Sequence, residues 1–324
     1  MGGKERMRAM TDIARASAPA SIGNVGPGFD ILGQAFDALQ DEVTARREAE
    51  PGVRLGKVSG RLKSLPDSPE RNTALAAAKA LLDDAGADFG VRLDIDKGVP
   101  LSAGMGGSAA SAVAAAVAVN ALLDKPYPHA ELLPFGLEGE RVSSDPPPWD
   151  NVMASLLGGL VIAARLDASQ VRRIPAPSGL VSIVAHPDAE IETRAARGIL
   201  RPSVAMETVV EHSRRLAAFV AGCAADDHDL IRAGLDDVLV EPQRRYLLPA
   251  LPAVKAAALQ AGALGCSFSG SGPSMFAWCQ ESDREHVEEA MRAAFAAAGQ
   301  SAHIYHAAIN SRGARLEPVS EAVG

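Results

Sequence analysis

The sequence predicts an α+β protein built from two domains. Its 324 residues are enough for two hydrophobic cores. Strand-like and helix-like segments follow one another without the strict β–α–β alternation that a doubly wound parallel sheet requires. Apolar residues make up 47% of the chain but aromatic residues only 4%, so we expect Ala, Val and Leu to fill the core between closely packed helices.

The first half is predicted to begin with strands and continue with helices. Residues 13–60 alternate short apolar stretches with Gly and Pro, as in strands joined by loops. Asn72 precedes a helical pattern that ends at Gly86, with Asn72 as the expected N-cap. A strand over 91–101 leads into a glycine-rich loop. Further helices are expected over 109–123, 131–143 and 150–157.

The second half is predicted to be richer in helices. Strands over 160–166 and 180–187 flank RRIPAPSG (172–179), the expected hinge between the domains. Later helices are expected over 203–221, 226–239, 249–262 and 283–298, with strands near 266–272, 274–279 and 303–309. The resulting division is a disordered or non-native start at 1–15, an N-terminal domain at 16–170 and a C-terminal domain at 171–324.

Charge and composition exclude several classes of function. A formal net charge of −8 argues against nucleic acids and acidic membrane surfaces as partners. No apolar run reaches the roughly 18 residues of a membrane span, and the opening residues lack the apolar region of a signal peptide. Three cysteines without a CxxC spacing indicate reduced thiols instead of disulfides or a zinc site. We therefore expect a cytoplasmic protein.

Residues 98–112 read GVPLSAGMGGSAASA and form the most informative stretch. A strand, a glycine-rich loop and a helix direct several backbone N–H groups at one point, and the helix N-terminus adds positive partial charge. The GxxxxGK[ST] and GxGxxG patterns are both absent. On this stretch alone, a phosphate-binding loop and an ordinary tight turn both remain open.

Two more glycine-rich stretches accompany this loop, ASAPASIGNVGPGFDILG (16–33) and GCSFSGSGPSMFA (265–277). In this order the three resemble the motifs of the GHMP kinases, and the resemblance extends from residue 18 to residue 309. Within that superfamily the chain is similar to the homoserine kinases, through NVGPGFDILG, DNVMASLLGGL (150–160), ARGIL (196–200) and the block EPQRRYLLPA to SGSGPS (241–274).

The resemblance implies a fold and an activity. The fold is the GHMP kinase two-domain α+β fold, with a ribosomal-protein-S5-like ATP-binding domain followed by a ferredoxin-like domain. The implied activity is phosphorylation of L-homoserine by Mg²⁺·ATP to O-phospho-L-homoserine, a step of threonine biosynthesis, in a cytoplasmic homodimer. Two alternatives stay open: a GHMP kinase of another small hydroxylated metabolite, and a GHMP-fold binding protein without catalysis.

The resemblance also implies a nucleotide and metal site. Ser108 and Glu140 would coordinate Mg²⁺, and Glu140 is preferred to Glu138 because ten positions separate it from Asp150. Ser108 would also touch the phosphate during transfer. An N-cap role for Ser108 or Asn72, and a solvated helix face for Glu140, are the structural alternatives. The ATP-binding residues implied are Pro100, Gly104, Met105, Gly106, Gly107, Ser108, Ala109 and Asn72.

For the acceptor, the resemblance implies a site that recognises a small amino acid. Arg197 and Arg244 would bind its carboxylate, since only Arg offers a planar pair of donors. Asp30 would hold the ammonium group. The remaining acceptor residues implied are Asn24, Asn151, Gly270, Ser271 and Gly272. Asn151 and Asp150 lie at the reacting end, where Asp150 acts as a base or the phosphate itself takes the proton.

The chain departs from the homoserine kinase pattern at two places. Gly107 replaces the first serine of the usual GLGSS, which removes one hydroxyl from the loop. In SSDPPPWDNV, Pro148 replaces a histidine and Asp145 stands where a glycine is usual, so the acceptor pocket is expected to have a different wall. Trp149 either covers that pocket or packs in the core.

Overall fold

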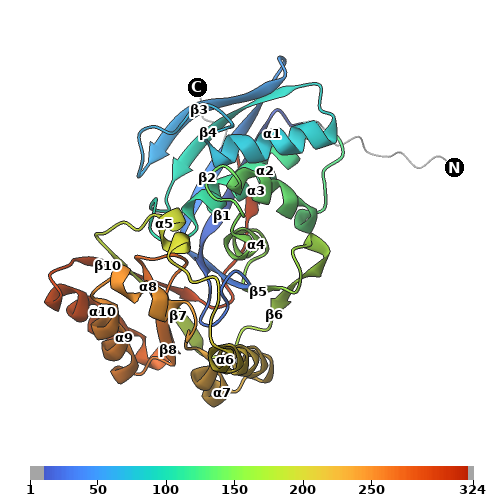
Figure 1. Cartoon of the computed structure of the whole chain (residues 1–324). Helices are drawn as coiled ribbons and strands as arrows, with labels where there is room; N and C mark the ends of the chain where they lie inside the picture. Colours follow the sequence, from blue (N-terminus) through green and yellow to red (C-terminus); the bar gives the residue numbers. More distant parts are fainter. Residues whose placement is uncertain (1–10, 320–324) are drawn as a thin grey trace.

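The computed structural model describes residues 11–319 and, within them, two β-sheets covered by helices (Figure 1). The strands of the first sheet are β1 (Ile13–Gly23), β2 (Leu32–Glu48), β3 (Gly52–Gly60), β4 (Gly90–Lys97), β5 (Leu160–Ala163), β6 (Val171–Ile174) and β11 (Arg315–Glu317). Those of the second are β7 (Leu180–Pro187), β8 (Gly265–Phe268), β9 (Met275–Gln280) and β10 (Ala302–Ala308). The helices are α1 (Thr73–Ala85), α2 (Gly107–Asn120), α3 (Leu133–Glu140), α4 (Trp149–Leu157), α5 (Thr193–Gly198), α6 (Met206–Ala225), α7 (His228–Gly234), α8 (Glu241–Arg244), α9 (Leu251–Gln260) and α10 (Arg284–Ala297). Short 3-10 helices occur at His129–Leu132, Ala168–Gln170, Arg245–Leu247 and Glu281–Asp283.

The topology confirms the predicted mixed α+β architecture. In the first sheet the strand order is β11-β1-β2-β4-β3, with β5 beside β2 and β6 beside β5. Only the β3–β4 pair of this sheet is parallel among the described residues. The second sheet has the antiparallel order β10-β7-β9-β8. In chain order this is fourth, first, third and second, the arrangement expected of a ferredoxin-like domain.

Helix α2 lies at the centre of the first domain: it packs on β1 and β2 of the sheet, α1 and α3 pack against it, and α4 lies on the same sheet in contact with it. All of its residues except Ser108 are buried, as expected for a helix that is apolar on every side. Its alanines let neighbouring helices come close: a Cβ added to Gly139 of α3 would lie only 3.0 Å from the Cβ of Ala112. Tight packing on all sides therefore fixes the position of the α2 N-terminus.

A buried ion pair holds the start of α2 against the sheet. Lys97 at the end of β4 and Asp41 in β2 are 1% and 0% exposed, and their charged groups pair directly. The Lys97 ammonium also donates to the carbonyl of Gly107 at 2.7 Å and to Ser111 Oγ at 2.9 Å. Asp41 accepts bonds from the backbone N–H groups of 98–99 at 3.0 Å. Both ends of the glycine-rich loop are thus tied to the same pair of charges.

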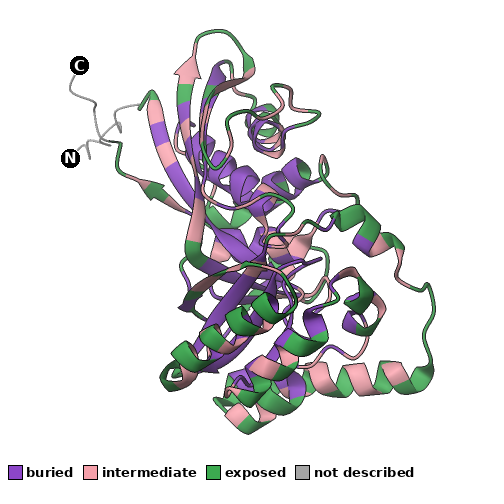
Figure 2. Cartoon of the chain, turned by 90° about the vertical axis from the view of Figure 1, so that its left-hand side faces the viewer, coloured by how far each residue is buried: buried purple, intermediate pink, exposed green. Residues whose placement is uncertain are grey.

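The second sheet is covered by α9 and α10 on one face and meets the first domain with the other. On the side toward the first domain, Trp278 of β9 donates from Nε1 to Oε1 of Gln34 in β2 at 2.8 Å. One apolar core continues across this junction, and Figure 2 shows the buried residues concentrated at the centre of the molecule. The two domains therefore share part of their core.

The boundaries of the domains differ from those expected. Residues 1–10 of the expected start lie outside the described residues, but Ile13 already begins β1, so the first domain starts before residue 16. Strand β6 pairs with β5, so residues 175–179 connect the two sheets; this connection lies within the expected hinge at 172–179 but beyond the expected domain boundary after residue 170. Strand β11 pairs with β1, so the last strand of the described residues belongs to the first sheet. Strands β6 and β11 are too short to show a clear alternation of apolar and polar residues in the sequence.

Two expectations from composition can be compared with the structure. Cys223, Cys266 and Cys279 are all buried and unbonded, in agreement with reduced thiols. Across the described part of the chain, every helix is too short or too polar to traverse a lipid bilayer.

The Lys97–Asp41 pair leads to a prediction about stability. Lys97→Met leaves the Asp41 carboxylate buried without its partner, and breaking such a pair costs about 3–5 kcal/mol. We expect the free energy of unfolding, measured by urea denaturation, to fall by that amount. Lys79→Met is the matched control, because Lys79 pairs with Asp83 on an exposed helix face and such a pair contributes at most about 1 kcal/mol. Equal losses in the two variants would contradict the anchoring role.

Candidate active site

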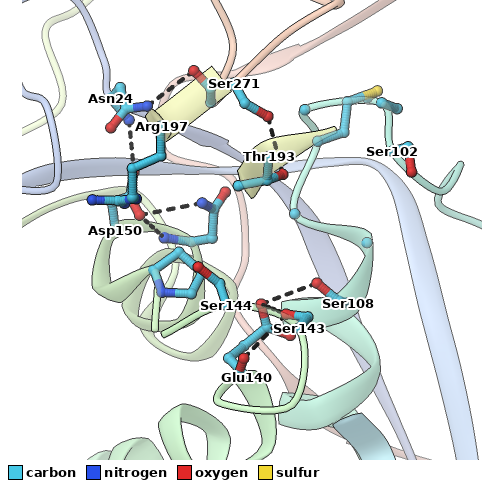
Figure 3. Close-up of a pocket in the computed structure, with 18 of the residues that line it drawn as sticks. Asn24, Ser102, Ser108, Glu140, Ser143, Ser144, Asp150, Thr193, Arg197 and Ser271 are labelled. Carbon is cyan, nitrogen blue, oxygen red and sulfur yellow. Dashed lines mark hydrogen bonds between the residues drawn. The ribbon is translucent and has the colours of Figure 1, made fainter. Parts of the chain in front are cut away.

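The three glycine-rich stretches, far apart in the sequence, meet at one cavity of about 420 Å³ between the domains (Figure 3). Backbone and side-chain bonds join them: Gly270 donates its N–H to the carbonyl of Gly23 at 2.9 Å, and Ser269 Oγ donates to the carbonyl of Gly104 at 2.6 Å. The predicted site residues on the cavity wall are Asn24, Asp30, Gly104, Met105, Gly106, Gly107, Ser108, Glu140, Asp150, Asn151, Arg197, Arg244, Gly270 and Ser271.

Two glycines of the loop are required by its backbone. Gly104 and Gly106 have φ of +71° and +64°, in the left-handed region that favours glycine. A Cβ on Gly104 would lie 2.3 Å from the carbonyl oxygen of Ser269, and one on Gly106 would lie 2.0 Å from Ser21 Oγ. Side chains here would force the three stretches apart.

The N-terminus of α2 opens toward the cavity. Gly106 is its N-cap and supplies no side chain to bond the free N–H groups of the first turn, and no acidic residue lies in that turn. These N–H groups, together with the helix dipole, favour a bound anion. The loop can therefore hold a phosphate group.

Glu140, at the end of α3, faces the start of α2. Its Oε2 accepts a hydrogen bond from Ser108 Oγ at 3.0 Å and another from Ser143 Oγ at 3.2 Å, whereas Oε1 is buried without a partner among the described residues. Burial raises the pKa of Glu140 to about 7, although both serine bonds act to lower it. An unpartnered carboxylate oxygen beside a hydroxyl is a donor set that fits Mg²⁺, which prefers oxygen ligands.

The structure accounts for the missing hydroxyl at Gly107. A Cβ there would lie 2.9 Å from the carbonyl oxygen of Pro100 and 3.3 Å from Cγ1 of Val99. A serine could enter only if the preceding strand end moved. Position 107 therefore adds no hydroxyl, and Ser102 and Ser108 are the serines of the loop that line the cavity.

On the acceptor side, Arg197 and Asp30 form a bidentate ion pair with N–O distances of 2.7 and 2.8 Å. Their side chains are 28% and 37% exposed, so a small molecule in the cavity can reach both. The pairing with Asp30 raises the pKa of Arg197. The predicted carboxylate-binding and ammonium-binding residues thus lie side by side.

Arg244 is held more deeply than Arg197. It donates from Nε to the carbonyl of Ala196 at 2.9 Å and from Nη1 to that of Gly270 at 3.3 Å. Its guanidinium carbon lies 5.2 Å from the centre of the Phe29 ring, and that of Arg197 lies 5.3 Å from the same ring. Burial and the charge of Arg197 lower the pKa of Arg244. Both guanidinium groups therefore lie near the Phe29 ring at one end of the cavity.

Asp150, at the start of α4, organises the residues around it. Its Oδ2 accepts the backbone N–H of Asn24 at 2.8 Å, and Oδ1 accepts the backbone N–H of Asn151 at 2.9 Å and Asn151 Nδ2 at 3.2 Å. Burial, followed by the nearby charge of Asp30, raises the pKa of Asp150 to about 7. The carboxyl group thus fixes two asparagines that also face the cavity.

Four predicted residues do not line the cavity. Asn72 caps α1: its side chain accepts from the N–H groups of residues 74 and 75 and donates to the carbonyl of Pro66. Its amide is therefore occupied, as the N-cap alternative expected. Gly272 packs against the Phe268 ring. Pro100 and Ala109 flank the loop without reaching the cavity wall. Their contact with ATP or with the acceptor stays a prediction.

Several residues of the cavity were not identified from the sequence. Thr193 Oγ1 lies 3.2 Å from Ser271 Oγ, and Phe29 and Ser143 also face the cavity. A serine three residues after Glu140 lies on the same side of a helical turn, which is the signal that could have found Ser143. Pro148 lines the cavity, whereas Trp149 packs against the core, as its second interpretation expected.

Comparisons with known proteins agree with this geometry. Residues 72–159 match the family model for the GHMP kinases N terminal domain, and residues 218–297 match that for the GHMP kinases C terminal domain. This chain is 46% identical over 304 residues to the homoserine kinase of Xylella fastidiosa (strain M12) and equally to that of Xanthomonas campestris pv. campestris (strain B100). In both cases the matched residues cover 94% of this chain and 94% of the relative. The crystal structure of homoserine kinase from Cytophaga hutchinsonii superposes with a TM-score of 0.91 at 37% identity, covering 96% of this chain and 99% of the other.

The burial of Glu140 leads to a prediction about pH. Because its pKa is raised to about 7, the folded protein holds a proton that the unfolded chain releases near pH 4.5. The free energy of unfolding that depends on this group therefore falls as the pH rises from 4.5 through about 7. Glu140→Gln cannot ionise, so we expect it to gain about 2–3 kcal/mol over the wild type in the free energy of unfolding between pH 4.5 and pH 8.

The control for this experiment is Glu138→Gln on the exposed face of the same helix, where an ion pair with Arg141 contributes at most about 1 kcal/mol at either pH. Urea denaturation of the wild type and both variants at the two pH values gives the six free energies of unfolding that are compared. A Glu140→Gln variant whose difference from the wild type does not change with pH would show that the carboxyl is not desolvated.

Proposed function

The chain belongs to the homoserine kinase family of the GHMP kinases, and from this membership we propose that it transfers the γ-phosphoryl group of ATP to the side-chain hydroxyl of L-homoserine. The observation that supports this most directly is the meeting, at one cavity, of an uncapped helix N-terminus and a pair of opposite charges suited to an amino acid. Phosphoryl transfer needs positioning and charge neutralisation more than covalent chemistry.

At the nucleotide end, the N–H groups of the loop and of the first turn of α2 bind the phosphates. Gly104 and Gly106 let the backbone approach the phosphates closely, and Lys97 holds the loop through its hydrogen bond to the Gly107 carbonyl. Ser108 and Glu140 would hold Mg²⁺, whose presence we propose from the donor set. When bound, this ion would supply positive charge that neutralises the charge developing on the phosphates during transfer.

At the acceptor end, homoserine is a zwitterion with one carboxylate and one ammonium group. Arg197 offers the carboxylate a planar fork, and Asp30 offers the ammonium group a carboxylate. The substrate would exchange with the existing ion pair, so both charges keep a partner. Arg244, which is buried at the same end of the cavity, adds positive potential. Its hydrogen bonds to the carbonyls of Ala196 and Gly270 keep it in place.

At the reacting end, Asn24 and Asn151 orient the acceptor hydroxyl. Asp150 holds both through their backbone N–H groups, and its three accepted hydrogen bonds favour a positioning role. We therefore propose that the hydroxyl proton passes to an oxygen of the phosphoryl group as the acceptor oxygen bonds to phosphorus and ADP leaves. Asp150 as a general base remains the competing assignment, since a pKa of about 7 suits that role as well.

The cellular setting follows the resemblance to the family. We propose a cytoplasmic homodimer that acts in threonine biosynthesis. Sedimentation of the purified protein tests the dimer, and threonine auxotrophy after deletion of the gene tests the pathway.

The acceptor can be identified with a panel of small alcohols. We expect ADP release and a new phosphomonoester signal in ³¹P NMR with L-homoserine, and neither with mevalonate, shikimate or pantoate, because only homoserine carries both charges that the Arg197–Asp30 pair can bind. Turnover of another alcohol with homoserine inactive would favour a different GHMP kinase. No turnover with any acceptor, despite nucleotide binding, would favour a binding protein.

Arg197→Lys tests the carboxylate contact. Lysine keeps the charge but loses the bidentate geometry, so we expect the KM for homoserine to rise about 10-fold to 100-fold while the KM for ATP stays within about twofold. The control is Arg201→Lys, an exposed arginine in the same segment whose side chain is outside the cavity. Equal increases in both Michaelis constants would contradict a role confined to the acceptor.

A further inference from the structure

Ser143 brings a second hydroxyl to Glu140 from outside the glycine-rich loop (Figure 3). It lies in the turn after α3, and its Oγ is 3.2 Å from Oε2 of Glu140 and 3.1 Å from the Glu140 carbonyl oxygen. Ser108 reaches the same Oε2 from α2. Two hydroxyls from different elements therefore converge on one carboxylate oxygen.

The turn leaves Ser143 little freedom. Its backbone N–H donates to the carbonyl of Glu140 at 3.0 Å, and the N–H of Ser144 donates to the same carbonyl at 3.0 Å. The backbone that carries the hydroxyl is thus fixed relative to the carboxylate. Ser144, although adjacent, directs its own hydroxyl to the carbonyl of Pro146 and makes no bond to Glu140.

The two hydrogen bonds have a consequence for the other oxygen. The carboxylate cannot turn about its last side-chain bond without losing both hydroxyls from Oε2. Oε1 is buried and has no partner among the described residues. Gly107 cannot provide a further hydroxyl, because a Cβ there would lie 2.9 Å from the Pro100 carbonyl oxygen. Ser143 is therefore the only hydroxyl besides Ser108 that bonds Glu140 within residues 11–319.

We propose that Ser143 is a positioning residue for the divalent cation of the kinase reaction: its hydroxyl holds Oε2 of Glu140 so that Oε1 stays available as a metal ligand. This inference rests on the proposed function, since it needs a metal–nucleotide complex in the cavity. Partners that orient a metal ligand typically change metal affinity by about 10-fold to 100-fold when removed.

The test measures metal binding without turnover. Mn²⁺ replaces Mg²⁺, and electron paramagnetic resonance of free Mn²⁺ gives its affinity for the protein–ADP complex. We expect Ser143→Ala to weaken Mn²⁺ binding about 10-fold, and Ser143→Thr, which keeps the hydroxyl, to restore it to within about threefold of the wild type. Calorimetry of ADP in EDTA should give the same affinity for all variants, because Ser143 does not bind the nucleotide.

Ser144→Ala is the matched control, since it removes the neighbouring hydroxyl from the same turn, and its Mn²⁺ affinity should equal that of the wild type. The inference is overturned if Ser143→Ala binds Mn²⁺ as the wild type does, if Ser144→Ala is equally weakened, or if ADP affinity in EDTA falls in parallel. A wild-type protein that binds no Mn²⁺ with ADP would overturn the proposed function together with the inference.

Discussion

The site depends on one constraint, which is that the N-terminus of α2 must stay fixed while its N–H groups remain free. Packing on every side of α2 fixes its axis, and the Lys97–Asp41 pair fixes its first turn. Lys97 binds the carbonyl of Gly107, which points away from the cavity, so the anchor leaves the N–H groups unused. A capping side chain would have occupied them, and the N-cap is instead a glycine. The loop is thus rigid and still able to receive phosphate oxygens.

The same region carries groups that make the free protein less stable. Glu140 and Asp150 are buried carboxyl groups, and burial raises the pKa of each to about 7. Neither has a direct cationic partner among the described residues. Such desolvated groups are typical of sites that gain their partners from a substrate or a metal. The acceptor end differs, because Arg197 and Asp30 already neutralise each other.

Much of the fold could be predicted from the sequence because local signals were strong. Asn72 and Gly86 mark the ends of α1, and an alanine-rich stretch marks the buried α2. Strands β6 and β11 could not be predicted with the right partners, since four and three residues carry no usable periodicity and their pairing is set by distant strands. The cavity residues were predicted mainly through the three motifs. The Asp41–Lys97 anchor and the Ser143 bond depend on contacts between elements, which spacing alone does not reveal.

The central claim is that the loop before α2 grips the phosphates of a nucleotide through its backbone. Its most direct test is an NMR titration of ¹⁵N-labelled protein with a non-hydrolysable ATP analogue and Mg²⁺. The account predicts that the amide resonances of Gly106, Gly107 and Ser108 shift most and become protected from exchange with water. Saturable binding that leaves these three amides unchanged would contradict it.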